Sequence, residues 1–380
     1  MTAAASYAEL PPVTTLALVC DDLAIALANV EQLVEEGRHD EAVEHLENLW
    51  PELRGDVALS FRHHLALSWS EMCRGELESA AGLLAHAKTI VKSPRFDACD
   101  RAELLYRRGC VAFKQGEVAD ATSLFTRALD LNEQAPRQRA LLAANVYEWR
   151  SRCYQFRRDW DAASRDTERS LEIATRVGDE PAQAHALFQA SAIAERRKAW
   201  LVARYYAERA LELYRKHGDV LLTGRILNNL GGINFLLGDV ATAEANLLAA
   251  TEKAADAGSD ADLAQAVNSL AHLLLRTGRP AEARVRAERA VELLAGRLDF
   301  RDELGNAQLV LARSLAAEGD LALAVDWIDE AEHTFGALGS TSHLALAWLA
   351  RGDVARESGD LETAADLYRQ AADSLQDVHF

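Results

Sequence analysis

The sequence is poor in several features that would place a chain in other classes of protein. It has only 7 prolines, and Pro51, Pro94, Pro136 and Pro181 stand between expected helical segments, where a helix must stop. Its 5 cysteines are scattered and include no C-x-x-C pair, which is typical of a reducing cytosol and not of a disulfide framework. No apolar run reaches the roughly 18 residues of a membrane span, and no signal sequence is evident. We therefore expect a cytoplasmic protein without a membrane partner.

The short motifs that carry catalysis, phosphate binding or metal binding are also missing. The sequence contains no G-x-S-x-G elbow, no G-x-x-x-x-G-K-[ST] loop, no G-x-G-x-x-G after a strand and no H-E-x-x-H. His63 and His64 are adjacent, so they point to different sides of a helix and cannot share one metal ion as an i, i+4 pair would. We predict that the protein is not an enzyme, that it has no cofactor or metal, and that these two histidines are structural.

Basic residues are few compared with acidic ones. The chain has 41 lysines and arginines against 59 aspartates and glutamates, which gives a net charge of -18 and a pI near 5.1. Because binding to phosphate backbones is driven by lysine and arginine, this balance argues against direct binding of nucleic acid.

What the sequence does have is one unit repeated from end to end, shown most fully by residues 224–250. Leu227, Leu230 and Gly231 recur at three- and four-residue steps, which line residues up on one face of a helix. Gly238 ends that helix, because glycine takes the left-handed backbone conformation without steric cost. A second amphipathic helix follows, so the unit is a helical hairpin.

If Gly224 is position 1 of this unit, nine copies of its turn follow one another at intervals of 38 to 42 residues. The residues at position 15, which form the turn, are Gly37, Gly75, Gly116, Arg158, Lys198, Gly238, Gly278, Gly319 and Gly359. All nine residues at position 20 are alanine: Ala42, Ala80, Ala121, Ala163, Ala203, Ala243, Ala283, Ala324 and Ala364. Position 8 is small in all repeats but the first, and position 27 is mostly alanine. Small residues at these positions indicate that the helices pack too closely for larger side chains.

This pattern resembles the tetratricopeptide repeat, with its small residue at position 8, turn glycine at 15, alanine at 20 and 27, and a bulky residue at 24. The period near 40 exceeds the family's 34, and the family's terminal proline is mostly absent. Such long-period arrays look like those of kinesin light chains and of bacterial peptide-sensing regulators of the Rap and PlcR type. The resemblance implies an all-α fold, a right-handed α-solenoid of about nine helical hairpins, and it is not specific for function.

The domain organisation that we predict is a single array with a short leader. Residues 1–21 form a flexible leader and residues 22–377 the superhelix, with less regular N-terminal repeats over 22–98 and a regular array over 99–377. The last helix carries an apolar stripe with nothing after it to cover it, so we expect it to contact a partner or a second copy of the chain, giving a homo-oligomer.

The inner face of the array is where we expect binding. In such superhelices positions 2, 5, 6, 9, 12 and 13 of each repeat point into the concave groove. The groove residues that we predict on this basis are Arg107, Asn145, Trp149, Arg152, His185, Gln189, Arg196, Arg225, Asn228, Asn229, Phe235, Asn268, His272, Arg276, Asn306 and Arg313. Basic residues outnumber acidic ones at these positions, although the whole chain is acidic.

The chemistry of these side chains suits an extended peptide. Asparagine is unfavourable inside a helix, so its repeated use indicates another gain, and its amide can donate to and accept from a peptide backbone. Arginine can bind a terminal carboxylate or an acidic side chain. The resemblance points to the same use of Asn228, Asn229, Asn268, Arg225 and Arg276. The alternative is that these are solvated polar residues of an exposed surface.

We therefore predict a non-catalytic adaptor or receptor whose groove binds an extended peptide or the tail of a protein partner, anionic or ending in a carboxylate, in bacterial signalling or regulation. Two alternatives stay open. One is the sensor portion of a helix-turn-helix transcriptional regulator whose DNA-binding domain is missing from this chain. The other is a self-associating scaffold.

Overall fold

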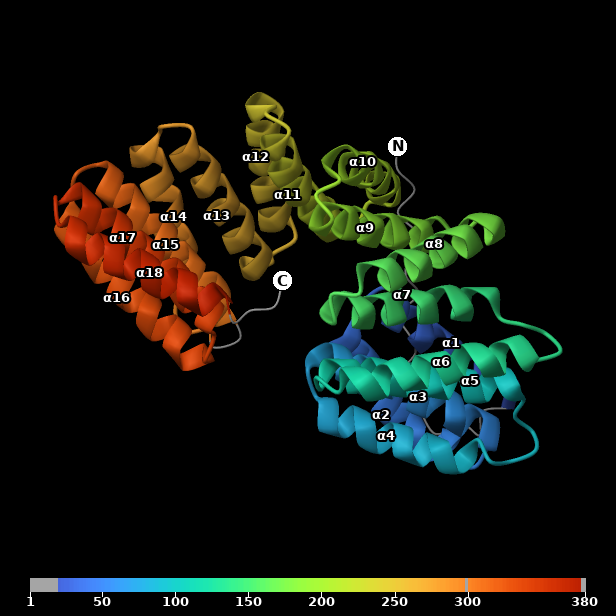
Figure 1. Cartoon of the computed structure of the whole chain (residues 1–380). Helices are drawn as coiled ribbons and strands as arrows, with labels where there is room; N and C mark the ends of the chain where they lie inside the picture. Colours follow the sequence, from blue (N-terminus) through green and yellow to red (C-terminus); the bar gives the residue numbers. More distant parts are fainter. Residues whose placement is uncertain (1–19, 298–299, 377–380) are drawn as a thin grey trace. The chain divides into compact units, whose positions relative to one another are not determined.

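The computed structural model describes residues 20–297 and 300–376, and the predicted leader lies, up to residue 19, outside them. Within the described residues the chain is built of helices and contains no strand (Figure 1), as the repeat pattern predicts. The helices of the first half are α1 (Cys20–Glu35), α2 (His39–Leu53), α3 (Val57–Arg74), α4 (Leu77–Ile90), α5 (Ala98–Lys114), α6 (Val118–Gln134), α7 (Ala140–Phe156) and α8 (Trp160–Val177). Those of the second half are α9 (Glu180–Arg196), α10 (Trp200–His217), α11 (Val220–Leu236), α12 (Val240–Asp256), α13 (Asp260–Arg276), α14 (Pro280–Leu294), α15 (Arg301–Ala317), α16 (Leu321–Leu338), α17 (Thr341–Glu357) and α18 (Leu361–Gln376).

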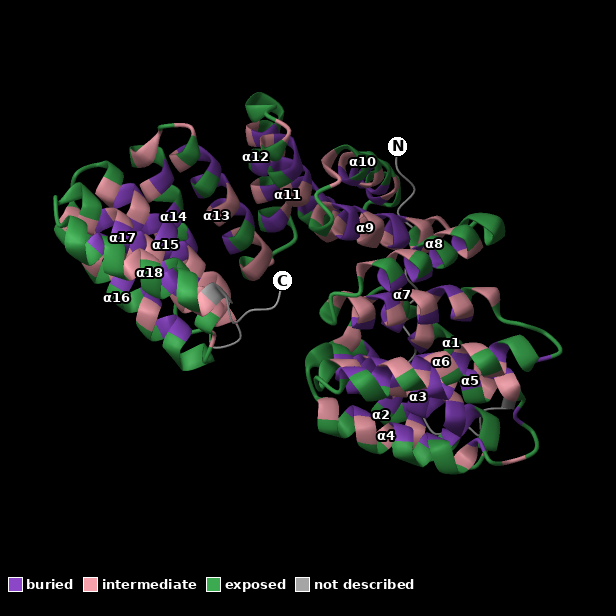
Figure 2. Ribbon diagram, in the orientation of Figure 1, coloured by how far each residue is buried: buried purple, intermediate pink, exposed green. Residues whose placement is uncertain are grey.

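The helices group into two compact units, residues 1–173 and 174–380. In the N-terminal unit each helix from α1 to α7 contacts the next, and the first helices of the hairpins, α1, α3, α5 and α7, also contact one another in turn. In the C-terminal unit each helix from α9 to α17 contacts the next one. The first helices of its hairpins, α11, α13, α15 and α17, also contact one another in turn. Most of the buried side chains are apolar. Buried residues lie where helices of one unit face each other (Figure 2), as expected for an array in which repeats bury surface against their neighbours.

All nine residues at position 15 adopt the left-handed conformation predicted for the turn, with φ between 58° and 91°. In the α11–α12 turn, the N–H of Gly238 donates to the carbonyl of Phe235 at 3.0 Å, and that of Asp239 donates to Asn234 at 2.9 Å. These bonds satisfy carbonyls that the helix end would leave free. The Asp239 carboxylate then accepts from the N–H of Thr242 at 3.1 Å and caps α12.

Two of these turns use a residue with a side chain, Arg158 at φ 58° and Lys198 at φ 59°. Lys198 is exposed, so we expect Lys198→Gly to raise the free energy of unfolding by about 1 kcal/mol, because a left-handed residue with a Cβ is strained and glycine is not. Urea unfolding checks this result. Lys198→Ala removes the same charge but keeps the strain, so equal effects of the two substitutions would refute the explanation.

The crowding inferred from small residues is confirmed. Every alanine at position 20 is at most 3% exposed. A Cβ built on Gly109 would lie 2.6 Å from the ring of Phe125, and one on Gly231 would lie 2.5 Å from Leu247, in each case the bulky residue at position 24 of the same repeat. Where position 8 is Ser151, its hydroxyl donates across the hairpin to the carbonyl of Ala163 at 2.9 Å.

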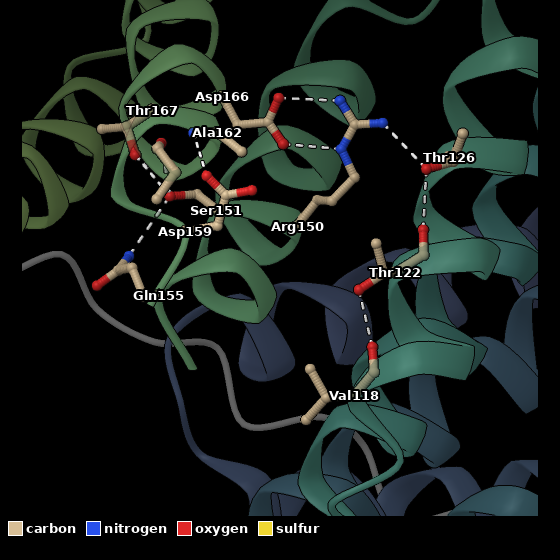
Figure 3. A network of polar contacts seen from close by, with 11 residues as sticks. Val118, Thr122, Thr126, Arg150, Ser151, Gln155, Asp159, Ala162, Asp166 and Thr167 are labelled. Carbon is tan, nitrogen blue, oxygen red and sulfur yellow. Dashed lines mark hydrogen bonds and ion pairs between the residues drawn. The ribbon is translucent and has the colours of Figure 1, made fainter. Parts of the chain in front are cut away.

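A buried ion pair joins α7 to α8 in the N-terminal unit (Figure 3). Arg150 binds both carboxylate oxygens of Asp166, at 2.7 and 2.9 Å, and donates at 3.1 Å to the hydroxyl of Thr126 on α6. The two charged side chains are only 15% and 8% exposed. Three helices therefore meet at one guanidinium group.

His63 and His64 are buried in the N-terminal unit. The Nε2–H of His63 donates to the carbonyl of Leu46 at 3.0 Å, and the Nδ1–H of His64 donates to that of Ser60 at 2.7 Å. The ring of His63 stacks on Trp50, with 4.8 Å between centroids. Its other nitrogen, Nδ1, is buried without a partner among the described residues, so a second proton there would have no acceptor.

Stability is expected to fall with acid because of His63. Burial lowers the pKa of His63 to about 4, the bond to Leu46 opposes this, and His64 adds to it. Below pH 6.5 the unfolded chain then binds a proton that the folded chain does not, so stability is lost as the pH falls from about 6.5 towards 4. In urea titrations, His63→Gln should make this decline shallower, by up to about 1.4 kcal/mol per pH unit. A control at exposed His333, His333→Gln, should leave the slope unchanged, and equal slopes for the wild type and His63→Gln would contradict the assignment.

The last helix, α18, lies with part of its apolar stripe against α17. Ala364 and Ala371 are buried, and the hydroxyl of Tyr368 donates to Asp353 at 2.8 Å, whereas Leu361 is 67% exposed. The predicted contact of this helix with a partner or a second copy stays a prediction.

Candidate functional site

A pocket of about 650 Å³ lies in the C-terminal unit, between the first helices of three consecutive hairpins, α9, α11 and α13. Leu247 of α12 adds one apolar side chain. Six of the residues predicted from the sequence line this pocket: Arg196, Asn228, Asn229, Phe235, His272 and Arg276. They occupy positions 5, 6, 9, 12 and 13 of their repeats, which share one helical face, and three adjacent repeats bring the three faces together.

One asparagine of this pocket, Asn228, and one outside its lining, Asn268, carry an unsatisfied side-chain oxygen. Asn228 Oδ1 and Asn268 Oδ1 are both buried and accept no hydrogen bond from the described residues. Buried polar atoms of folded proteins normally have a partner, so these oxygens are open to a donor such as the N–H of a bound peptide. Asn228 and Asn229 line the pocket, and Asn268 occupies position 5 of the next repeat along.

The basic residues of the site are not neutralised by neighbours. Arg196 and Arg276, which line the pocket, and Arg313, which lies outside its lining, form no ion pair with a residue that the structure describes. Partial removal from water lowers the pKa of His272, and the charges of Arg313 and Arg276 lower it further. Burial also lowers the pKa of Arg313, Asp353 opposes this, and Arg276 adds to it. A pocket with unpaired guanidinium groups attracts an anion.

Three polar residues that the sequence analysis did not include also line the pocket: Glu195, Gln265 and Ser269. Burial raises the pKa of Glu195, and Arg196 partly opposes this shift. All three occupy positions 2, 6 or 12 of their repeats, so the position alone would have found them.

Other predicted residues of the C-terminal unit lie elsewhere. Arg225 is exposed and binds both carboxylate oxygens of Asp262, at 2.6 and 3.0 Å, and it does not line the pocket. Nδ1 of His185 lies 3.4 Å from the hydroxyl of Tyr214. The remaining two, Gln189 on α9 and Asn306 on α15, are half-buried and also outside the pocket lining.

The predicted arginines of the N-terminal unit are held by carboxylates one helical turn away. Arg107 donates to Glu103 at 2.8 Å and lies 4.5 Å above the ring of Trp69. Arg152 donates to Glu148 at 2.6 Å. These pairs neutralise the two arginines that the sequence predicts for the groove of this unit.

Trp149 belongs to the core of the N-terminal unit. It is 7% exposed and packs edge-on against Trp69 and Phe113, with centroids 6.1 and 5.8 Å apart. Its ring faces Arg152 at 4.7 Å. Asn145 lies on the same helix, α7, and is half-buried. This unit therefore uses its predicted aromatic residue for packing.

Metal ligands and membrane spans were also sought. Over residues 20–297 and 300–376, no three histidine, cysteine, aspartate or glutamate side chains come together in a way that could hold a metal ion. No helix within the same ranges has the length and apolar character needed to cross a membrane.

Sequence comparison gives the class of the protein. Models of the tetratricopeptide repeat match residues 102–135, 222–295, 305–330 and 337–377. The chain contains tetratricopeptide repeats over these residues, in agreement with its helical hairpins, left-handed turns and buried alanines. No curated protein matches its sequence.

Several solved structures have a similar fold. The apo form of RapI gives a TM-score of 0.71 at 14% identity, over 94% of this chain and 98% of that one. A Rap protein in complex with competence and sporulation factor gives a TM-score of 0.67 at 17% identity, over 94% of this chain and 98% of that one. The apo form of the quorum sensor NprR from B. thuringiensis gives a TM-score of 0.68 at 14% identity, over 93% of this chain and 99% of that one. At these identities the likeness is one of fold.

Proposed function

We propose that this protein is a non-catalytic receptor whose pocket between α9, α11 and α13 binds an extended peptide carrying an anionic group. The observation that supports this most is that one pocket of about 650 Å³ holds the buried Oδ1 of Asn228, which has no partner among the described residues, together with Arg196 and Arg276, which form no ion pair with a described residue. An amide oxygen of a merely solvated surface residue would be hydrogen-bonded to water, whereas burying it without a partner costs free energy.

Each kind of side chain has a distinct part in this proposal. The amides of Asn228 and Asn229 bind the peptide backbone, whose N–H and C=O groups are the same in any sequence. Arg196 and Arg276 bind a C-terminal carboxylate or an acidic side chain. Phe235 offers an apolar surface for one side chain of the ligand.

The similar solved structures support a ligand of this kind. The Rap protein was solved with competence and sporulation factor, and NprR with its cognate peptide NprX. For the present chain, a peptide that touches α9, α11 and α13 at once would tie three hairpins together and favour one arrangement of them. A partner that recognises that arrangement would then respond to the peptide.

A pool of synthetic heptapeptides tests this function, each peptide made with a free and with an amidated C-terminus. Peptides retained by the wild-type protein are identified by mass spectrometry, and their affinities are measured by fluorescence anisotropy. We expect Asn228→Ala and Arg276→Ala each to weaken binding about tenfold or more, because each removes hydrogen bonds to the peptide, and those of Arg276 are charge-assisted.

The matched control is Arg286→Ala, which removes an exposed and unpaired arginine from α14, outside the pocket. It should bind as the wild type does. Retention of no peptide, or affinities that neither pocket substitution changes, would refute the proposed function.

A further inference from the structure

A second pocket, of about 380 Å³, lies in the N-terminal unit on one face of α4, α5 and α6. Helix α5 contacts both α4 and α6 (Figure 1), and Leu84, Val111 and Leu124 supply apolar lining from the three helices. Its volume is within the range of small-ligand sites. The proposed peptide receptor function does not use it.

The rim of this pocket carries five charged residues, three basic and two acidic: Lys88, Arg108, Arg127, Glu117 and Asp120. None of these side chains forms a hydrogen bond or ion pair with a described residue, although opposite charges surround the same small pocket. Elsewhere in this unit, oppositely charged side chains from different repeats do form ion pairs, as Arg139 does with Asp100 at 2.5 Å.

The opposite charges do not pair because they lie at opposite ends. The turn at Gly116 reverses the chain, and the contact between Gly109 and Phe125 fixes the register of α5 against α6. Arg108 is therefore level with Arg127, whereas Asp120 is two turns away along α6. On α4, Lys88 is at position 28 of its repeat, close to the level of Arg127 at position 26.

The pocket is thus basic at one end and acidic at the other. Arg127 follows Asp120 by seven positions, which at 1.5 Å per residue is about 10 Å along the helix. Three residues of extended peptide also span about 10 Å. A helix of the same length, about 10 Å wide, would occupy roughly twice the volume of this pocket.

We infer that this pocket is a binding site for a short zwitterionic peptide of about three residues. The N-terminal ammonium group lies at Glu117 and Asp120, and the C-terminal carboxylate lies among Lys88, Arg108 and Arg127. The apolar floor holds the side chains between them. Charge at both ends fixes both the length and the direction of the ligand.

Titration calorimetry and ligand-observed NMR with the tripeptide Ala-Ala-Ala test this site in the full chain. We expect binding to the wild type, and at least tenfold weaker binding of the N-acetylated and of the C-amidated tripeptide. Arg127→Glu and Asp120→Lys should each weaken binding of Ala-Ala-Ala at least tenfold. Both residues are exposed, so neither change should disturb the fold, which circular dichroism verifies.

Two controls separate this site from other causes. Arg165→Glu and Asp130→Lys reverse exposed charges of the same unit outside the pocket and should leave the affinity unchanged. Arg276→Ala alters the pocket of the C-terminal unit and should also leave it unchanged, so this inference and the proposed function fail separately. Absence of binding at millimolar tripeptide, indifference to Arg127→Glu, or loss of binding in Arg276→Ala would each overturn the inference.

Discussion

Asp166→Ala should lower the free energy of unfolding of the N-terminal unit by about 3 to 5 kcal/mol, as measured by urea unfolding followed by tryptophan fluorescence. The substitution leaves the guanidinium of Arg150 buried at 15% exposure, with the hydroxyl of Thr126 as its remaining hydrogen-bond partner and the rings of Tyr147 and Tyr154 beside it. Burial acts to lower the pKa of Arg150, and the hydrogen bonds and charge of Asp166 outweigh it. Without that carboxylate the cost of desolvating the cation is no longer offset.

An exposed pair on the same helix is the matched control. Arg169 and Glu172 are 2.7 Å apart and both are more than half exposed, so Arg169→Ala should leave the free energy of unfolding almost unchanged. The double substitution Arg150→Met/Asp166→Leu removes both charges and should recover most of the loss. Equal losses for Asp166→Ala and Arg169→Ala would mean that the buried pair contributes no more than a surface one.

Gly109→Leu should destabilise the α5–α6 hairpin by about 3 kcal/mol in the same assay. A single Cβ at this position would already lie 2.6 Å from a ring that is fully buried, so a leucine forces Phe125 or the helix backbone to move. The intrinsic helix preference of leucine over glycine acts the other way by less than about 1 kcal/mol, and overpacking outweighs it.

Gly82 provides the control because it lies within α4 and has nothing within 4 Å of a built Cβ. Gly82→Leu should therefore be neutral or slightly stabilising. Phe125→Ala alone should cost about 3 to 5 kcal/mol through the cavity it leaves. In the double variant Gly109→Leu/Phe125→Ala, leucine occupies that cavity, so the combined loss should be at least about 1 kcal/mol less than the sum.

Much of the fold could be predicted from the sequence because each repeat has the same residue types at the same positions of the hairpin. A left-handed turn at position 15 and an alanine at position 20 are demanded by geometry within one hairpin. The rule holds even where Lys198 replaces glycine at the turn. The pocket of the C-terminal unit follows in part for the same reason, since helical spacing alone places Asn228 and Arg276 on inner faces.

What escaped prediction depends on contacts between repeats. Arg225 occupies an inner position, but Asp262 in the first turn of α13 binds it, and no pattern within one repeat reveals that partner. Trp149 is likewise an inner-face residue by position, yet it is buried because Trp69 and Phe113 of neighbouring repeats extend over it. Whether an inner-face residue is exposed, paired or buried therefore depends on the size and register of side chains from adjacent repeats.

The strained turns at Arg158 and Lys198 lie on either side of residue 173, where the compact units divide. In an array whose repeats are stabilised mainly by their neighbours, cooperativity is limited by its weakest hairpins. Denaturant should therefore melt the protein in two separable steps, each half losing its structure as a block. A pulse of protease at intermediate urea would then leave one half intact and digest the other.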